Sequence, residues 1–132
     1  MSNSIDSHLS THASALSLRA QRAGLLASNL ANADTPNYKA RDFNFTDALR
    51  AQLNTTGTGL KATHKSHIAT TPGQVATTDL LYRVPQEPSL DGNTVDTDVE
   101  QAEFAQNSIR YQASLEFLGR KISGLIRTLR SE

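Results

Sequence analysis

Apolar residues recur along the first third of the chain at alternating spacings of four and three. The positions are Leu9, Ala13, Leu16, Ala20, Ala23, Ala27 and Leu30. This heptad pattern is typical of a helix that packs lengthwise on another helix. The residues between these positions are mostly helix formers or small polar groups, and the first proline is Pro36. The pattern predicts a helix from about Ile5 to about Asn32, roughly 40 Å long at about 1.5 Å per residue.

The same spacing returns in the last third of the chain with larger side chains. The positions are Phe104, Ser108, Tyr111, Leu115, Leu118, Ile122, Leu125 and Leu129. Just upstream, Thr97 and Glu100 have the spacing of a capping box, in which a hydroxyl and a carboxylate satisfy free backbone donors. Asp91-Gly92-Asn93 before them is a turn signal. A second helix is therefore predicted from about Asp98 to Leu129.

Between the two patterns the chain is polar and shows no sustained period. NTTGTGLKATHKSHIATTPG is rich in Thr, Gly and Lys, and RVPQEPSLDGN adds two prolines and a turn. We expect loop or short extended structure from about Asn54 to Asn93. Tyr38, Phe43 and Phe45 alternate with polar residues, as in a short half-exposed strand.

These patterns predict a mainly α fold in which long N- and C-terminal helices pair as a coiled-coil core domain. We expect an N-terminal core helix over residues 1–34 and a C-terminal core helix over residues 97–132. Residues 35–96 are expected to form a junction and a loop or short-stranded middle segment, partly disordered in the isolated subunit. At 132 residues, one domain is the default.

Apolar residues that lie off the two main stripes predict contacts between copies. Within one chain, the expected coiled-coil contacts are Leu16, Ala20, Leu115, Leu118, Ile122 and Leu125. Residues expected to contact other subunits are Leu18, Leu25, Ile109 and Phe117. A lone pair of helices would leave this second set in water, so we predict a homo-oligomer or polymer.

The composition supports an assembling protein over a compact enzyme. Hydrophobic residues make up 37% of the chain and there is no Trp, so a self-sufficient core is not expected. Lys+Arg and Asp+Glu both number 13, which gives no indication of nucleic-acid binding. Acidic residues nevertheless gather before and at the start of the second predicted helix and basic residues at its end, an order that the helix dipole favours.

The absence of certain features excludes several classes. The chain has no cysteine, which excludes disulfides, thiol catalysis and cysteine-ligated metals. No apolar run approaches the roughly 20 residues of a membrane span, so we expect no direct lipid insertion. The N-terminus MSNSIDSHLSTHAS lacks the basic start and apolar block of a cleavable signal peptide. Export, if it occurs, must use a route that needs no such signal.

Catalytic and metal-binding patterns are weak. His8 and His12 are four residues apart on the first predicted helix, but the glutamate of an HExxH motif and a third ligand are missing. His64 and His67 lie in the polar middle, and no serine elbow or phosphate-binding loop occurs. Asp96, Asp98 and Glu100 are simpler to explain as helix-start acids. We therefore expect no enzyme activity, cofactor or metal site.

The junction SNLANADTPNYKARDF, Ser28 to Phe43, is the most specific feature of the sequence. The amides of Asn29 and Asn32 fall in the last helical turn, where they can satisfy terminal carbonyls or fix register across a helix interface. Pro36 and Asn37 form a turn, since the residue before proline is pushed out of helical geometry. With Tyr38, these residues should orient the chain that leaves the first helix toward a neighbouring subunit.

This junction resembles the N-terminal signature of the bacterial flagellar basal-body rod family, "xNxANxxTPxY". The matching positions are Asn29, Leu30, Ala31, Asn32, Thr35, Pro36 and Tyr38. KARDF, residues 39–43, and the segment Asp91 to Ile122 resemble the proximal-rod members more than rod and hook members with larger central domains. Thr97 departs from the family, which more often has an apolar residue there, but a cap at this position is compatible with the resemblance.

The resemblance implies a structural subunit that self-assembles through its terminal helices into the torque-transmitting rod of the basal body. It implies as partners further copies, other rod proteins such as FlgC, the adaptor FliE and the MS-ring protein FliF. It also implies export through the flagellar type III apparatus without a cleaved signal peptide, and a periplasmic location in the rod. The alternatives are another rod member, such as an FlgC-like subunit, a soluble helical adaptor or export chaperone, and, third, a metal-dependent enzyme.

Overall fold

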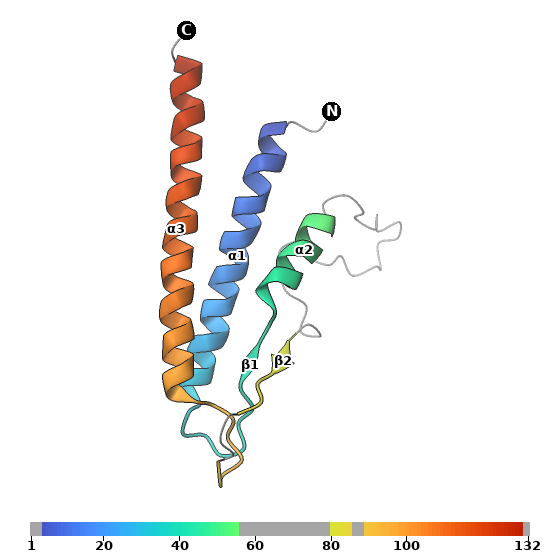
Figure 1. Cartoon of the computed structure of the whole chain (residues 1–132), viewed down its shortest axis with the longest axis vertical. Helices are drawn as coiled ribbons and strands as arrows, with labels where there is room; N and C mark the ends of the chain where they lie inside the picture. Colours follow the sequence, from blue (N-terminus) through green and yellow to red (C-terminus); the bar gives the residue numbers. More distant parts are fainter. Residues whose placement is uncertain (1–3, 56–79, 86–88, 131–132) are drawn as a thin grey trace, which may run out of the picture.

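The structure is a computed structural model that describes residues 4–55, 80–85 and 89–130 (Figure 1). Its elements are α1 (Ser4–Ala31), β1 (Arg41–Asp42), α2 (Phe45–Thr55), β2 (Leu81–Tyr82) and α3 (Thr97–Arg130). α1 and α3 run antiparallel side by side, and α2 lies on the side of α1 away from α3. β1 and β2 form a short antiparallel pair. The mainly helical fold with long terminal helices and a short-stranded middle is confirmed.

The interior of the chain is small and partly polar. Leu18 and Leu26 on α1 are fully buried, and Ala40 and Phe43 are buried as well. On α3 the two buried residues are Glu100 and Asn107. The Asn107 amide donates to the backbone carbonyl of Arg19, with an Nδ2 to O distance of 2.9 Å. The contact between the long helices therefore includes polar groups that select one alignment of the two helices.

The face that α1 buries differs from the predicted heptad stripe. Ala13, Ala20 and Ala27 are exposed, although Ala20 was expected in the coiled-coil contact. Leu18, expected at a contact between subunits, is 0% exposed inside the chain, which is a correction. The reason is that α1 is covered from two directions, by α3 and by α2 with β1, so its buried residues do not follow one stripe.

Much of the predicted stripe on α3 is also exposed within the chain. Leu118 is half-buried, while Leu115, Ile122 and Leu125 are 52%, 41% and 37% exposed, so the intramolecular contact expected of them stays a prediction. Arg22 contacts Glu103 and Arg19 contacts Asn107, an alignment that puts Ser4, the start of α1, opposite about residue 122 of α3. The end of α3 therefore extends beyond α1 (Figure 1), and every described residue from Gly119 onward is exposed.

α2 was not predicted. We expected a strand through Tyr38, Phe43 and Phe45, but the structure has the two-residue strand β1 and then a helix. Asn44 caps this helix, since its Oδ1 accepts from the backbone N–H groups of Thr46 at 3.0 Å and Asp47 at 3.3 Å. The guanidinium of Arg19 lies 4.4 Å from the centre of the Phe45 ring and holds the start of α2 against α1.

The start of α3 uses a different cap from the predicted one. Oδ1 of Asp96 accepts from the backbone N–H groups of Asp98 at 3.1 Å and Val99 at 3.2 Å, so the cap is Asp96 and not Thr97. Glu100 is buried and takes part in other contacts. Of the expected loop from Asn54 to Asn93, residues 56–79 and 86–88 lie outside the described part of the chain, and the described part contains β2.

Candidate assembly site

The chain turns twice at the end of the molecule where α1 ends and α3 begins. Asn37 has φ of 61° and Gly92 has φ of 74°, the left-handed region that asparagine and glycine tolerate best. The backbone N–H of Asn37 donates to the carbonyl of Asp91 at 2.9 Å. A Cβ atom on Gly92 would lie 2.6 Å from Oδ1 of Asn37, so the close approach of these two turns requires glycine.

Asn93 closes the C-terminal end of α1. Its side-chain amide, 5% exposed, donates to the carbonyls of Asn32, Ala33 and Thr35 at 3.0, 2.6 and 3.0 Å. All three carbonyls belong to the turn that directly follows α1, which ends at Ala31. The residue comes from the segment just before α3, so one amide joins the end of the first long helix to the approach to the second.

Asn29 joins three parts of the chain from a fully buried position. Its Oδ1 accepts from the backbone N–H of Arg41 at 3.1 Å, and its Nδ2 donates to the carbonyl of the same residue at 2.9 Å. Nδ2 also donates to Oε2 of Glu100 at 3.1 Å. The side chain thus pairs with β1 as a neighbouring strand would and contacts α3 at the same time. The amide therefore lies at the interface of the two long helices, and its expected role in fixing their register stays a prediction.

The other junction residues surround this point. Nδ2 of Asn32 donates to the carbonyl of Ser28 at 2.8 Å, the terminal-carbonyl role expected of it. Tyr38 donates from its hydroxyl to Oδ1 of Asn29 at 3.4 Å. Pro36 and Asn37 are exposed in the turn. The structure therefore brings these junction residues together at one end of the molecule, where they hold the chain against the segment before α3.

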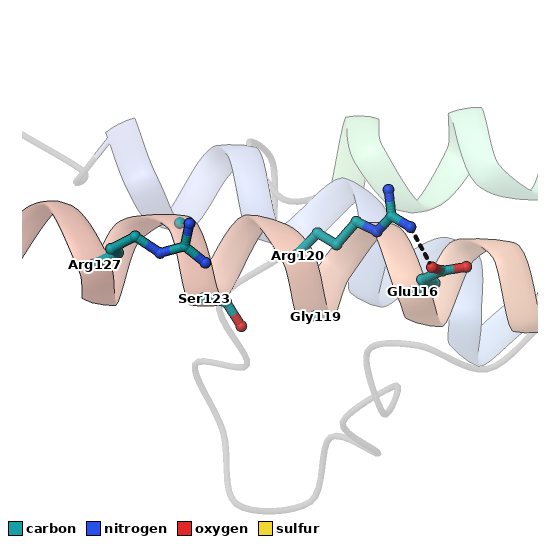
Figure 2. Close-up of a pocket in the computed structure, with 6 residues that line it drawn as sticks. Glu116, Gly119, Arg120, Ser123 and Arg127 are labelled. Carbon is teal, nitrogen blue, oxygen red and sulfur yellow. Dashed lines mark hydrogen bonds and ion pairs between the residues drawn. The ribbon is translucent and has the colours of Figure 1, made fainter.

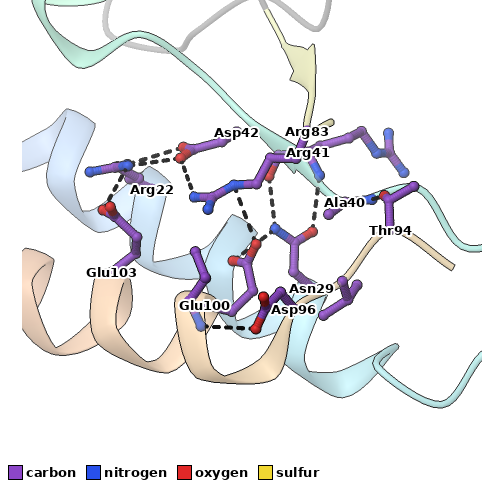
Figure 3. A network of polar contacts seen from close by, with 12 residues as sticks. Arg22, Asn29, Ala40, Arg41, Asp42, Arg83, Thr94, Asp96, Glu100 and Glu103 are labelled. Atoms are coloured by element: carbon purple, nitrogen blue, oxygen red, sulfur yellow. Dashed lines mark hydrogen bonds and ion pairs between the residues drawn. The ribbon is translucent and has the colours of Figure 1, made fainter. Parts of the chain in front are cut away.

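A network of charged side chains connects α1, β1, the residue that follows β2 and α3 (Figure 3). Arg22 binds both carboxylate oxygens of Asp42, at 3.0 and 2.7 Å, and Oε2 of Glu103 at 3.1 Å. Arg83 binds Asp42 at 2.7 Å and Glu100 at 3.3 Å. The network holds the strand pair against both long helices.

The charges in this network stabilise one another. Burial alone would raise the pKa of Asp42, but hydrogen bonds from Arg22, the backbone N–H of Phe43 and Arg83 together lower it. The hydrogen bond to Asp42 raises the pKa of Arg22, against the opposing effect of burial. Asp42 is therefore held in its charged form.

The network was not predicted from the sequence. Glu100 and Glu103 fit the acidic start of a helix, while Arg22 lies on α1, Asp42 on β1 and Arg83 directly after β2. The one available signal was the spacing of three between the two glutamates, which places both on one side of a helix.

A row of large apolar side chains remains exposed on α3. We call it the apolar stripe: Phe104, Leu115, Ile122, Leu125, Ile126 and Leu129, all more than one third exposed. At about 3.6 residues per turn these positions fall on one side of the helix. Ile109 and Phe117, expected at contacts between subunits, are exposed as well, and Leu25 is half-buried. Exposed apolar rows of this length mark interaction surfaces.

The described residues offer little for chemistry. Among their side chains no three His, Cys, Asp or Glu residues are grouped closely enough to hold a metal ion. The hollow in Figure 2 is open to solvent and lies along α3 alone, between Glu116 and Arg127. His64 and His67 lie outside the described part of the chain. No described helix combines the length and the apolar character needed to cross a membrane.

The sequence of this chain is similar to those of known proteins in the region of α1 and the junction and along the rest of the chain. Residues 9–39, which span most of α1 and the junction, match the family described as "Flagella basal body rod protein". A protein of Salmonella typhimurium named "Flagellar basal body rod protein FlgB" is 46% identical, over 98% of this chain and 97% of its own length. The chain belongs to the flagellar basal-body rod protein family.

Further FlgB proteins resemble this rod-family chain over nearly its whole length. The FlgB protein of Aeromonas hydrophila is 47% identical over 100% of this chain and 99% of its own. That of Cereibacter sphaeroides is 52% identical over 94% of both. These relatives are named as rod proteins, and their names indicate no catalytic activity. The resemblance inferred from the junction is thereby confirmed, and the chain is a structural protein of the flagellar basal body.

Proposed function

We propose that this chain is a proximal-rod subunit that self-assembles through its terminal helices into the shaft that transmits torque. The observation that carries the proposal is the apolar stripe, which α1 leaves uncovered although the two helices are paired. Fully burying a side chain of this size contributes about 1.5–3 kcal/mol, so covering several of them can offset the cost of association. A neighbouring subunit supplies that cover.

A shaft under torque also needs subunits that do not bend at their joints. The junction supports this role, because Asn29 and Asn93 connect the two long helices through buried hydrogen bonds. The network around Asp42 further ties the middle segment to both helices. The angle at which α3 presents the apolar stripe is therefore fixed by the end of the molecule that carries the family signature.

The partners follow from family membership and from the resemblance. We propose contacts with further copies, with other rod proteins such as FlgC, with the adaptor FliE and with the ring protein FliF. The location would be the periplasmic part of the basal body, reached through the flagellar type III export apparatus without removal of a signal peptide. The principal alternative, a soluble helical adaptor or export chaperone, would use the same stripe but stay discrete at high concentration.

The experiment compares Ile122→Asp with Leu53→Asp in cells that lack the native chain. The two side chains are similarly exposed, 41% and 37%, but Leu53 lies on α2, outside the apolar stripe. We expect Ile122→Asp to abolish swimming and to be absent from isolated basal bodies, and Leu53→Asp to support both. Circular dichroism should show the same helix content for both proteins. Normal swimming with Ile122→Asp would contradict the proposal.

A further inference from the structure

The face of α3 turned away from α1 is exposed along its whole length. We call it the outer face: its N-terminal half carries Asp98, Ala102, Ala105 and Ile109, and its C-terminal half carries Glu116, Arg120, Ser123 and Arg127. Every one of these residues is exposed. They lie about half a turn from the buried residues Glu100 and Asn107. No described element covers this face.

The C-terminal half of the outer face leaves room for a close neighbour. Gly119 and Gly124 line the open hollow beside Ser123 (Figure 2). A Cβ atom added at either glycine would meet no described atom within 4 Å. Glycine inside a helix lowers its stability relative to alanine, and nothing in the described chain requires it here. Small side chains at such positions let a second helix approach closely.

Charge is sorted between the two ends of the molecule, and Asp98 and Arg120 carry this sorting onto the outer face. Among the described residues near the end of α3, Arg120, Lys121, Arg127 and Arg130 are exposed beside one acid, Glu116, which pairs with Arg120 at 2.6 Å. At the opposite end of the molecule, Asp34, Asp91, Asp96 and Asp98 are exposed near two bases, Lys39 and Arg41.

The helix dipole explains only part of this sorting, because its effect falls off within the first and last turns. Lys121 lies more than two turns before the end of α3, and Asp34 and Asp91 lie in loops outside any helix. The sorted charges therefore call for a partner whose charges are sorted in the opposite order.

We infer that the partner is a second copy of this chain, in which the N-terminal half of the outer face packs on the C-terminal half of the first. The two α3 helices point in the same direction and are shifted along their axes by about 30 Å, since Ala105 and Ser123 are about 27 Å apart and Asp98 and Arg120 about 33 Å. Acid then meets base, and alanine meets the glycines. This inference rests on the proposed function, because an open shaft requires a contact that repeats.

The parallel direction of the two α3 helices follows from the need for a contact that can repeat without closing on itself. An antiparallel pair of outer faces would match both halves at once and stop at two copies, whereas a shifted parallel contact leaves one free half at each end and continues. Exposed ion pairs add little affinity and are screened by salt. Their role here is to fix the direction and shift of neighbouring copies, while apolar contacts supply the affinity.

A charge exchange tests the pairing. Arg120→Glu and Asp98→Lys should each weaken self-association about three- to tenfold at low salt, measured by sedimentation, because each places like charges together. An equal mixture of the two variants should restore association, since each then meets a complementary partner. Arg50→Glu on α2, whose side chain is also exposed, is the matched control and should associate as the wild type does. Unchanged association of both single variants, or no recovery in the mixture, would overturn the inference.

Cross-linking tests the direction. The chain has no cysteine, so Ala105→Cys with Ser123→Cys introduces two defined thiols that are too far apart to join within one helix. Oxidation should give a ladder of linked species larger than two copies. A control with Thr46→Cys and Ser123→Cys should give no linked species, because Thr46 on α2 does not face position 123 of a neighbouring copy.

The outcomes separate the inference from the proposed function. Linked pairs alone would indicate the antiparallel arrangement and overturn the inference. Association of the wild type without any linkage would also overturn it, while the assembly proposal stands. A wild-type chain that stays monomeric at every concentration would contradict both.

Discussion

Arg22 on α1 holds the carboxylate of Asp42 on β1 by two parallel hydrogen bonds, at 3.0 and 2.7 Å. The two side chains are each 14% exposed, so little water competes for these contacts. Arg83 approaches one of the same oxygens at 2.7 Å. One carboxylate thereby connects α1 with β1 and with Arg83, the residue that follows β2. A substitution of this one side chain therefore tests how much the network stabilises the middle segment.

Replacing Asp42 with Asn should destabilise the fold by about 2 kcal/mol. The substitution keeps the shape but removes the charge that two partly buried guanidinium groups share, and breaking such pairs is more harmful than removing an exposed one. Urea unfolding measures the difference. Asp47→Asn is the control, because its pair with Arg50 is exposed and should contribute less than about 0.5 kcal/mol. Equal effects of the two substitutions would show that the network adds no stability.

The same carboxylate predicts a loss of stability in acid. Its pKa in the folded chain lies below the ordinary value of 3.8 because of the hydrogen bonds from Arg22, Phe43 and Arg83, which outweigh burial. A lowered folded pKa gives a contribution that is fully present above the unfolded pKa and disappears as the pH falls through the folded pKa. The difference in unfolding free energy between wild type and Asp42→Asn should therefore shrink from pH 5 toward pH 2. A constant difference over that range would contradict the assignment.

Gly92→Ala should destabilise the turn that meets the junction. The new Cβ atom would lie 2.6 Å from Oδ1 of Asn37, and the backbone has φ of 74°, which alanine disfavours. We expect a loss of about 1–3 kcal/mol by thermal unfolding. Gly24→Ala on α1 is the control, since nothing lies within 4 Å of its added Cβ, and it should stabilise the helix by up to about 1 kcal/mol. A Gly92→Ala protein as stable as wild type would mean that the two turns do not approach this closely.

The long helices could be predicted because a 3.6-residue period repeated over many turns leaves little ambiguity. The expected ranges, about Ile5 to Asn32 and about Asp98 to Leu129, lie within one residue of α1 and α3 at each end. The junction could be predicted for the same local reasons, since Pro36 and the asparagines act on neighbouring backbone.

The predictions that were wrong concern contacts between residues that are distant in the sequence. The heptad pattern did not show that α2 and β1 cover a second side of α1, so Leu18 was assigned to the surface and Ala20 to the interior. α2 itself had readable signals, the cap Asn44 and apolar residues at helical spacing from Phe45 onward, but the alternation before it favoured a strand. Glu100 has the spacing of a capping box, whereas its actual partners, Asn29 and Arg83, are far away in the chain.

Asn29→Asp should be the most damaging isosteric substitution in the junction. The amide donates to the carbonyl of Arg41 and to the carboxylate of Glu100, and aspartate would replace both donors with a second negative charge beside a buried one. We expect a loss of about 3 kcal/mol or more in urea unfolding. Glu100→Gln in the same chain should recover about half of it, because the glutamine amide can donate to the new carboxylate. Since the two residues belong to different helices, recovery in the double variant measures their coupling directly. Strictly additive losses would show that Asn29 does not connect α1 to α3 in solution.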